Sequence, residues 1–196
     1  MRKLVLLAVL LAPATAAAQS TGTPVFAAPY RAFTRSEVGL SLSDMDGGTG
    51  FEGFYKTGHQ KWDLGFRAGF IDVDVADNPL LLGVDGRTRL VTHDQSFPLD
   101  GSLTVGAGAM LQDNFNVFNI PVGFSMGRRV DLEGSSVSFV PYFQPVASLV
   151  FGDADSDILF SIGLGADIRV DRNLDLRVAG AVGDMDGVSI SVAWLR

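Results

Sequence analysis

Apolar and polar residues alternate with a period of two over most of this chain, and the helical period of 3.6 residues is almost absent. The alternating segments are separated by clusters of Gly, Asp, Asn or Pro, which favour turns. Each segment has nine to fifteen residues. A tilted membrane strand needs about 9–11 residues, whereas strands in soluble domains average about 5–6. The pattern predicts about ten strands, at 36–44, 49–57, 61–71, 80–92, 99–111, 116–127, 137–151, 158–170, 173–183 and 187–195.

The most regular alternation lies at the C-terminus, where Val188, Ile190, Val192 and Trp194 share one face of the final segment. Small or polar residues occupy its other face. A regular terminal strand with a Trp near its end is typical of a closed barrel, whose last strand pairs with its first. The sequence therefore predicts an all-β fold, a transmembrane antiparallel up-and-down β-barrel of about ten strands, with eight as the alternative count.

Three features decide which face of the strands points inward. A soluble barrel directs its apolar face to the interior, whereas a membrane barrel directs it to lipid. Here the polar face is rich in Gly, Ser and Ala, as a narrow lumen requires, and its charges have both signs. The two Trp residues, Trp62 and Trp194, fall at strand ends on the same rim, where an aromatic girdle is expected. These features favour the membrane barrel over a secreted sandwich or a soluble ligand-holding barrel.

The charged residues of the polar face are predicted to form ion pairs across the lumen. They are Glu37, Glu52, Asp63, Arg67, Asp85, Arg87, Arg89, Asp167, Arg169, Asp175 and Arg177. The alternative is a polar path for small solutes. A lumen of about ten strands is narrow and is usually filled by side chains, so a large open pore is not expected.

The N-terminus has the features of an export signal. Arg2 and Lys3 precede an apolar run at 4–11, and a region of small residues ends at Ala18. The apolar run is shorter than the roughly 20 residues of a membrane-spanning helix. We expect a cleaved signal peptide at 1–18, an N-terminal lead-in at 19–35 and the barrel at 36–196. The lead-in is either periplasmic or part of an extra strand.

Composition excludes several classes of function. The chain has no Cys, which rules out disulfides, thiol chemistry and Cys metal sites. Its net charge of −7 would be repelled by nucleic-acid phosphates. After the N-terminal run, no stretch is apolar enough for a helical membrane span. No cofactor is expected.

The turns separate by charge. If the N-terminus of the barrel is periplasmic, the outward loops are acidic and contain no Lys, Arg or His: 43–48, 72–78, 112–114, 152–157 and 183–187. Asp-Gly and Asp-Asn form turns readily, which explains these residues without a ligand. The alternative is weak binding of divalent cations that bridge to lipopolysaccharide, with Asp44, Asp46, Asp153, Asp155, Asp184 and Asp186 as candidates. The spacing at 153–157 lacks the Gly and the closing Glu of an EF-hand.

Catalytic residues are not expected. The only histidines, His59 and His93, lie in turns assigned to the periplasmic side, away from the acidic loops. Acid–base or nucleophilic catalysis would need a partner within hydrogen-bond reach. A paired-carboxylate site built from Asp44, Asp46, Asp184 and Asp186 is the alternative. The sequence favours a protein that is not an enzyme.

The chain resembles the small outer-membrane β-barrel proteins of Gram-negative bacteria, the OmpA/OmpX-like group. The matching features are the export signal, Pro141-Tyr-Phe143, Ile162-Gly-Leu-Gly-Ala-Asp-Ile-Arg169 and the final hairpin at 183–194. Members usually end on Phe or another aromatic, whereas this chain ends Trp194-Leu-Arg196. Many simple members have eight strands. No peptidoglycan-binding domain follows the barrel, so no tether to the cell wall is implied.

The resemblance implies a porin-like cell-envelope protein in the outer membrane, with a structural or surface-interaction role. Its partners would be outer-membrane lipids, lipopolysaccharide and the outer-membrane assembly machinery. A monomer is expected. The alternatives are a narrow porin for small solutes and an enzyme that modifies lipid A.

Overall fold

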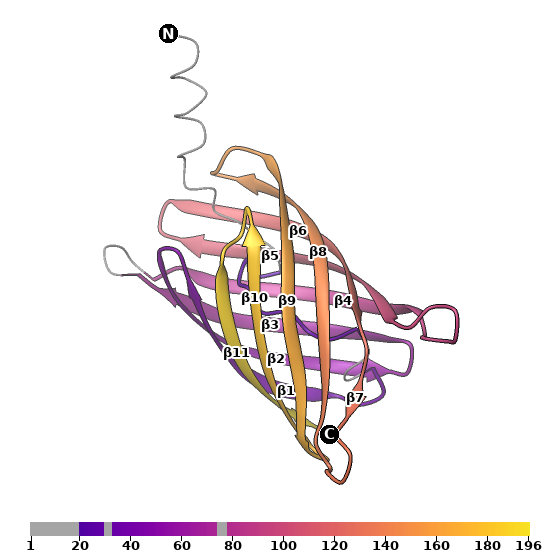
Figure 1. Ribbon diagram of the computed structural model, residues 1–196. Coiled ribbons are helices and arrows are strands. Elements are labelled where there is room, and N and C mark those ends of the chain that lie inside the picture. Colours follow the sequence, from indigo (N-terminus) through magenta and orange to yellow (C-terminus); the bar gives the residue numbers. More distant parts are fainter. Residues whose placement is uncertain (1–19, 30–32, 74–77) are drawn as a thin grey trace.

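The computed structural model describes residues 20–29, 33–73 and 78–196, and all of its regular elements are strands (Figure 1). They are β1 (Glu37–Met45), β2 (Gly48–His59), β3 (Trp62–Asp72), β4 (Leu80–Val91), β5 (Asp100–Gln112), β6 (Phe115–Gly127), β7 (Val130–Asp131), β8 (Ser138–Gly152), β9 (Asp157–Asp171), β10 (Leu174–Gly183) and β11 (Gly187–Leu195). The predicted signal peptide at 1–18 lies outside the described residues, as do Asp74 and Asp77 of the third connection. The proposed boundaries between signal, lead-in and barrel stay predictions.

Ten of these strands form a closed antiparallel barrel. Each pairs with its neighbours in sequence, β1 pairs with β11, and β6 pairs with β8. The two-residue β7 pairs only with the first two residues of β8. The prediction of about ten strands is confirmed, and the alternative of eight is excluded. Closure leaves the wall without a free edge, as a bilayer requires, since lipid cannot hydrogen-bond to unpaired backbone groups.

Among the described residues, no helix is long and apolar enough to cross a bilayer.

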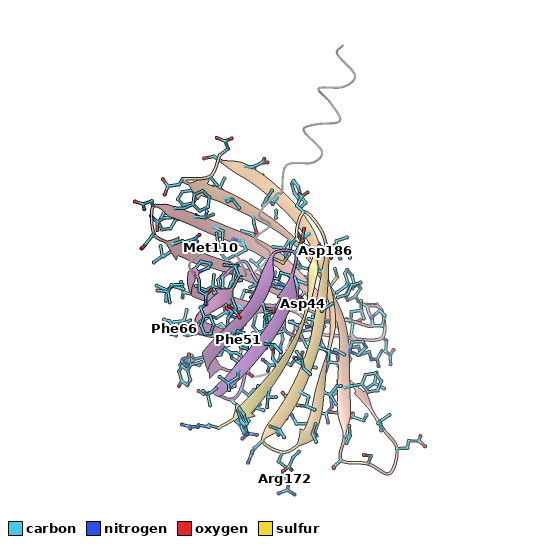
Figure 2. The ribbon with its side chains drawn as sticks, turned by 90° about the vertical axis from the view of Figure 1, so that its left-hand side faces the viewer. Asp44, Phe51, Phe66, Met110, Arg172 and Asp186 are labelled. Carbon is cyan, nitrogen blue, oxygen red and sulfur yellow. The ribbon has the colours of Figure 1, made fainter. Side chains whose placement is uncertain are left out.

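The apolar face of each strand points outward, which confirms the inverted arrangement of a transmembrane barrel. Phe66 is 50% exposed on β3, whereas its neighbour Arg67 is 5% exposed. On β9, Phe160 is 63% exposed and Ser161 is 5% exposed. Figure 2 shows Phe51 and Phe66 projecting from the wall. The outward apolar side chains form an apolar band around the barrel. Strands of nine to fifteen residues supply this band because alternation with a period of two keeps the two faces separate along the whole strand.

The hairpin connections fall into two sets, one at each end of the barrel. The connections β1–β2, β3–β4, β5–β6, β8–β9 and β10–β11 lie at one end, which we call the acidic end. Figure 2 shows Asp44 and Asp186 toward this end and Arg172 at the other. Turns here need backbone with positive φ, which Gly47 supplies at +101° and Asn114 at +62°. Gly and Asn tolerate this conformation better than other residues.

The register of the closing pair β1–β11 can be tested with a disulfide. Ser41 lies directly opposite Ser191. The Arg196 N–H donates to the Ser36 carbonyl, and hydrogen-bonded and non-hydrogen-bonded pairs alternate along antiparallel strands. Counted from that bond, Ser41 and Ser191 form a non-hydrogen-bonded pair. Cα atoms in such pairs are about 4.5 Å apart, within reach of a disulfide. We expect the variant S41C/S191C to oxidise and to show altered mobility on non-reducing gels.

The matched control is S41C/S189C, in which the second cysteine is shifted by two residues. Diagonal neighbours lie about 7–8 Å apart, too far for an unstrained bridge. Equal cross-linking of the two variants would contradict the register.

Candidate functional site

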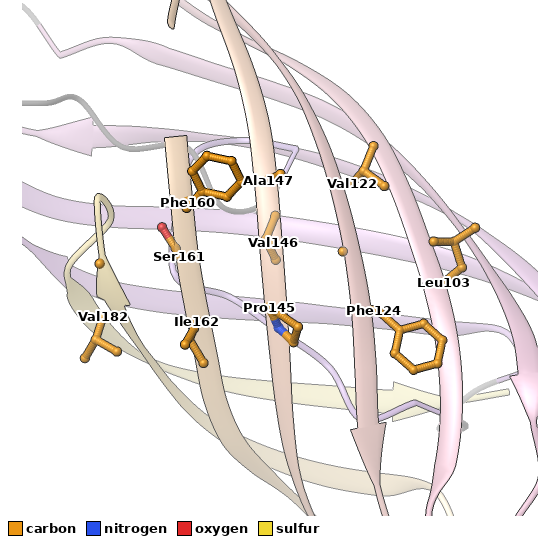
Figure 3. A pocket seen from close by; sticks show the side chains of 12 residues that line it. Leu103, Val122, Phe124, Pro145, Val146, Ala147, Phe160, Ser161, Ile162 and Val182 are labelled. Carbon is orange, nitrogen blue, oxygen red and sulfur yellow. The ribbon is translucent and has the colours of Figure 1, made fainter. Parts of the chain in front are cut away.

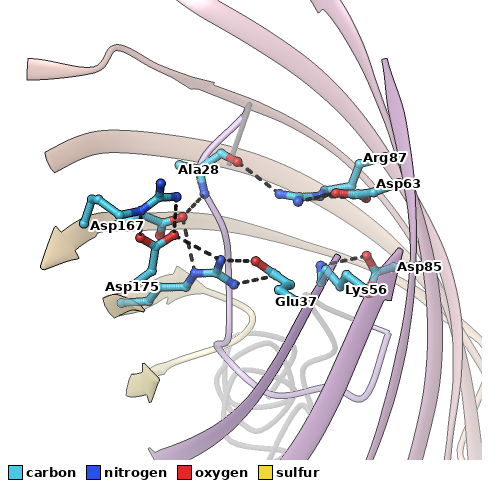
Figure 4. A network of polar contacts seen from close by, with 10 residues as sticks. Ala28, Glu37, Lys56, Asp63, Asp85, Arg87, Asp167 and Asp175 are labelled. Atoms are coloured by element: carbon cyan, nitrogen blue, oxygen red, sulfur yellow. Dashed lines mark hydrogen bonds and ion pairs between the residues drawn. The ribbon is translucent and has the colours of Figure 1, made fainter. Parts of the chain in front are cut away.

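The lumen holds a dense set of buried charged side chains (Figure 4). Asp63 and Arg87 are direct neighbours in the β3–β4 register, and their side chains form a hydrogen-bonded ion pair. Both are less than 5% exposed. Burying a charge costs free energy unless the charge is paired. The β3–β4 register meets this requirement because it places Asp63 beside Arg87.

Two further pairs reach across or along β3 because glycine leaves room on that strand. Lys56 Nζ on β2 lies 3.0 Å from Asp85 Oδ2 on β4. Gly65 lies between them in register, and a Cβ there would be only 2.8 Å from Asp85 Oδ1. Arg67 Nε also lies 3.4 Å from Glu52 Oε1, next to Gly69.

Arg177 on β10 is the centre of the network. Its guanidinium donates to both carboxylate oxygens of Glu37, at 2.9 and 2.5 Å. It also lies 3.4 Å from Asp167 and 3.8 Å from Asp175. The long reach to Glu37 crosses β11, whose inward residues, Ser191 and Ala193, are small. This contact therefore joins β10 to β1 over the closing strand.

Arg169 and Arg89 differ in their surroundings. Arg169 bonds to Asp175, its neighbour in the β9–β10 register. Arg89 makes no ion pair within the described part of the chain, and the prediction that it joins the lumen pairs is not reproduced there. Its guanidinium carbon lies 5.3 Å from the ring centroid of Phe33. Arg87 lies over the same ring, with its guanidinium carbon 5.1 Å from the centroid, so Phe33 contacts both arginines.

Residues 20–29 run through the lumen, a placement that the sequence did not indicate. All of them except Gly22 are buried, and six strands contact them through hydrogen bonds. Figure 4 shows Ala28 between Asp167 and Arg87: its N–H donates to Asp167 at 3.1 Å, and its carbonyl accepts from Arg87 at 3.0 Å. We call residues 20–29 the lumen segment.

The lumen segment runs from the acidic end toward the opposite end. Ser20 lies against Gly83 and Gly108, near the acidic ends of β4 and β5, and a Cβ on Gly108 would collide with the Ser20 carbonyl. Ala28 reaches the other half of the barrel through Arg87 and Asp167. Glycines on the inner wall thus make the space that this segment occupies.

An apolar patch on the inner wall receives Phe26 of the lumen segment. Phe26 is 2% exposed and packs with Val140, Tyr142 and Val146 of β8 and with Met185. A Cβ on Gly163 would touch its ring. Both faces of β8 are therefore apolar over much of its length, which departs from the alternation of the other strands.

The described carboxylates of the acidic end are not gathered into a metal site. Among the described residues, no three His, Cys, Asp or Glu side chains are grouped so that they could hold an ion. Two of the candidates instead bind backbone amides of neighbouring strands. Asp153 accepts from the Asn116 N–H at 2.8 Å, and Asp184 accepts from the Phe160 N–H at 2.7 Å. Asp44, Asp46, Asp155 and Asp186 lie in the same set of connections or at its strand ends.

The histidines and the tryptophans lie toward the end opposite the acidic loops. Trp62 and Trp194 are 47% and 46% exposed on the outer wall. His59 stacks on Trp62 with ring centroids 4.2 Å apart, and His93 Nδ1 lies 3.0 Å from Asp100 Oδ2. Near His93, the Ser96 hydroxyl and the amides of Ser96 and Phe97 hold the pKa of the exposed Asp94 carboxyl below its usual range.

A shallow apolar groove of about 590 Å³ lies on the outer wall over β5, β6, β8, β9 and β10 (Figure 3). The small side chains of Pro145 and Ala147 lie between larger ones, among them Phe124, Phe160 and Ile162. Phe124 and Ser125 of β6 have no partner in the β6–β8 register, and Pro145 of β8 lies opposite this gap. Proline has no N–H that could join the hydrogen-bond ladder between the strands. The groove and the apolar band lie on the same outward face of the barrel.

No protein-family model matches the chain, and no curated protein sequence matches it either. Solved structures that it resembles include a designed transmembrane β-barrel, at 18% identity, covering 83% of this chain and 96% of that one, with a TM-score of 0.44. The N-terminal barrel domain of Pseudomonas aeruginosa OprF matches at 12% identity, covering 83% and 98%, with a TM-score of 0.41. Acinetobacter baumannii Omp33 matches at 12%, covering 85% and 100%, with a TM-score of 0.41. At such identities the likeness concerns the fold alone.

The Arg177 cluster supplies a stability test. Replacing Arg177 by Met leaves Glu37 and Asp167 buried without their shared cation, which should lower the free energy of unfolding by about 3–5 kcal/mol. Unfolding by urea in phospholipid vesicles, followed by tryptophan fluorescence, measures this.

The matched control is R129M. Arg129 pairs with Asp131, but both side chains are more than half exposed. Its loss should cost no more than about 1 kcal/mol. An R177M effect no larger than that of R129M would contradict the central role of Arg177.

Proposed function

We propose that this protein is an outer-membrane barrel with a structural and surface-interaction role, whose lumen is closed in the resting molecule. The observation that carries the proposal is the filled interior: paired charges line the wall, and the lumen segment lies among them. A wall with an apolar exterior and a filled interior spans a bilayer without a wide channel. The surfaces of such a barrel that remain available to partners are the outer apolar band and the two sets of connections between strands.

Location and orientation belong to the same proposal. The export signal and the outward apolar band support insertion into the outer membrane of a Gram-negative bacterium by its assembly machinery. The acidic end would then face outward, toward lipopolysaccharide, and the end with Arg172 would face the periplasm. We propose a monomer, because the barrel closes on itself through β1 and β11.

A role without catalysis is supported by the positions of the histidines. His59 stacks on a rim tryptophan, and His93 of the β4–β5 connection pairs with Asp100 at the start of β5. Asp184, one of the four residues of the paired-carboxylate alternative, accepts a hydrogen bond from the Phe160 backbone amide. A lipid A-modifying activity would instead need a reactive group and a base in mutual contact. Expression of the protein should leave the mass profile of lipid A unchanged.

A narrow porin is the second candidate. It is favoured by the polar inner wall, whose charges of both signs could carry small hydrated solutes. It is opposed by the lumen segment, which occupies the same space.

The proposal is tested first by gel mobility and conductance. Protein taken from an outer-membrane fraction should migrate faster unheated than heated, because a closed barrel resists SDS. In planar bilayers the same material should be silent. Stable conductance of the full chain would favour the porin, and recovery from the soluble periplasm without heat-modifiability would overturn the membrane barrel itself.

A further inference from the structure

The lumen segment occupies space that a ten-stranded barrel creates. An eight-stranded barrel has an interior just wide enough for its own side chains, and the diameter grows with strand number. Here the extra width is occupied by residues 20–29 and Phe33. Glycines face this segment at positions 83, 106, 108 and 163, where a Cβ would contact it. The wall is thus shaped around a polypeptide.

Most of the polar contacts between the wall and the segment involve the backbone of the segment; a side-chain contact is made by the Thr23 hydroxyl, which donates to Glu52 at 2.6 Å. Ser189 and Ser125 donate to the carbonyls of Pro24 and Ala27, at 2.7 and 3.2 Å. Arg67 and Arg87 donate to the carbonyls of Val25 and Ala28, at 3.3 and 3.0 Å. Asp167 accepts from the N–H of Ala28 at 3.1 Å.

A single aromatic side chain anchors the segment. Phe26 is buried in the cluster that includes Val146 and Met185, while the other residues of the lumen segment are small or short. Hydrogen bonds to a main chain that give affinity, with a pocket for a side chain that gives selectivity, are the usual elements of a site for an extended peptide. No cysteine exists to fix the segment to the wall. If cleavage follows residue 18, the segment is joined to the barrel only where it leads into β1.

We propose that the lumen is a binding site for an extended peptide of small residues with one aromatic anchor. Residues 20–29 occupy it as part of the same chain, their removal opens a path for small ions, and an added peptide closes that path again. This inference rests on the proposed membrane barrel. It goes further by assigning the closed state to a removable segment rather than to the wall charges alone.

The experiment compares ion flux through vesicles that contain the full-length barrel or a variant lacking residues 22–29. The deletion leaves the predicted cleavage region intact. We expect the full chain to stay at background and the deletion variant to raise flux several-fold, with its heat-modifiable mobility retained. The synthetic peptide STGTPVFAAP, which has the sequence of residues 20–29, should then restore the block. Linked segments act at millimolar effective concentration, so the free peptide is titrated to on the order of 1 mM.

The matched peptide control carries F26A, and it should block less at the same concentration. Block by both peptides alike, or by neither, would overturn the binding site. A deletion variant that is silent but still heat-modifiable would overturn the removable segment while leaving the membrane barrel in place. Conductance of the full-length chain would instead contradict the closed resting state.

A second variant tests the proposal if the deletion variant does not fold. F26A in the full chain removes the anchor, whereas F97A removes an exposed phenylalanine from a turn. We expect higher flux for F26A than for F97A, both as heat-modifiable barrels. Equal flux at background would overturn the role of Phe26 as the anchor and with it the proposed site.

Discussion

The absence of hydrogen-bonding solvent in a bilayer is the constraint on which the rest of this structure depends. Every backbone group of a strand in lipid has to find its partner within the protein, so the sheet must close. Closure is made by β1 with β11 and by β6 with β8. Lipid around the closed wall turns the apolar face outward, so the inner face carries polar groups that have to bond to one another.

Ten strands make that requirement harder to meet than eight. The charged side chains pair between neighbouring strands, as for Asp63 with Arg87, or over a glycine of the strand between them, as for Lys56 with Asp85. The remaining room is occupied by the lumen segment, whose backbone carbonyls accept bonds from Arg67 and Arg87. The ion pairs and the segment therefore form one network, since the same guanidinium of Arg87 binds a carboxylate and the segment.

The ten barrel strands and their bounds to within two residues could be predicted from the sequence, because period-two alternation records them directly. The direction of their faces followed from other features: a polar face rich in small residues, charges of both signs on that face, and the positions of the two tryptophans. A neighbouring pair such as Asp63 with Arg87 follows from hairpin register. The bond of Arg177 to Glu37 does not, since it depends on small residues of the strand between them. The lumen segment has no alternation and contains prolines, so nothing in its pattern distinguishes an interior path from an exposed one. Arg89 lies on the polar face as predicted, but only the structure reveals Phe33 beside it.

The two tryptophans allow the contact of the apolar face with lipid to be measured without any substitution. Both lie on the outer wall near one rim and supply the whole tryptophan fluorescence of the chain. The decisive measurement is quenching of that fluorescence in vesicles whose lipids carry bromine on their acyl chains. An apolar face turned to lipid predicts strong quenching by brominated lipid and weak quenching by acrylamide in the water. Strong quenching by acrylamide with no effect of the brominated lipid would place these faces in water and contradict the membrane barrel.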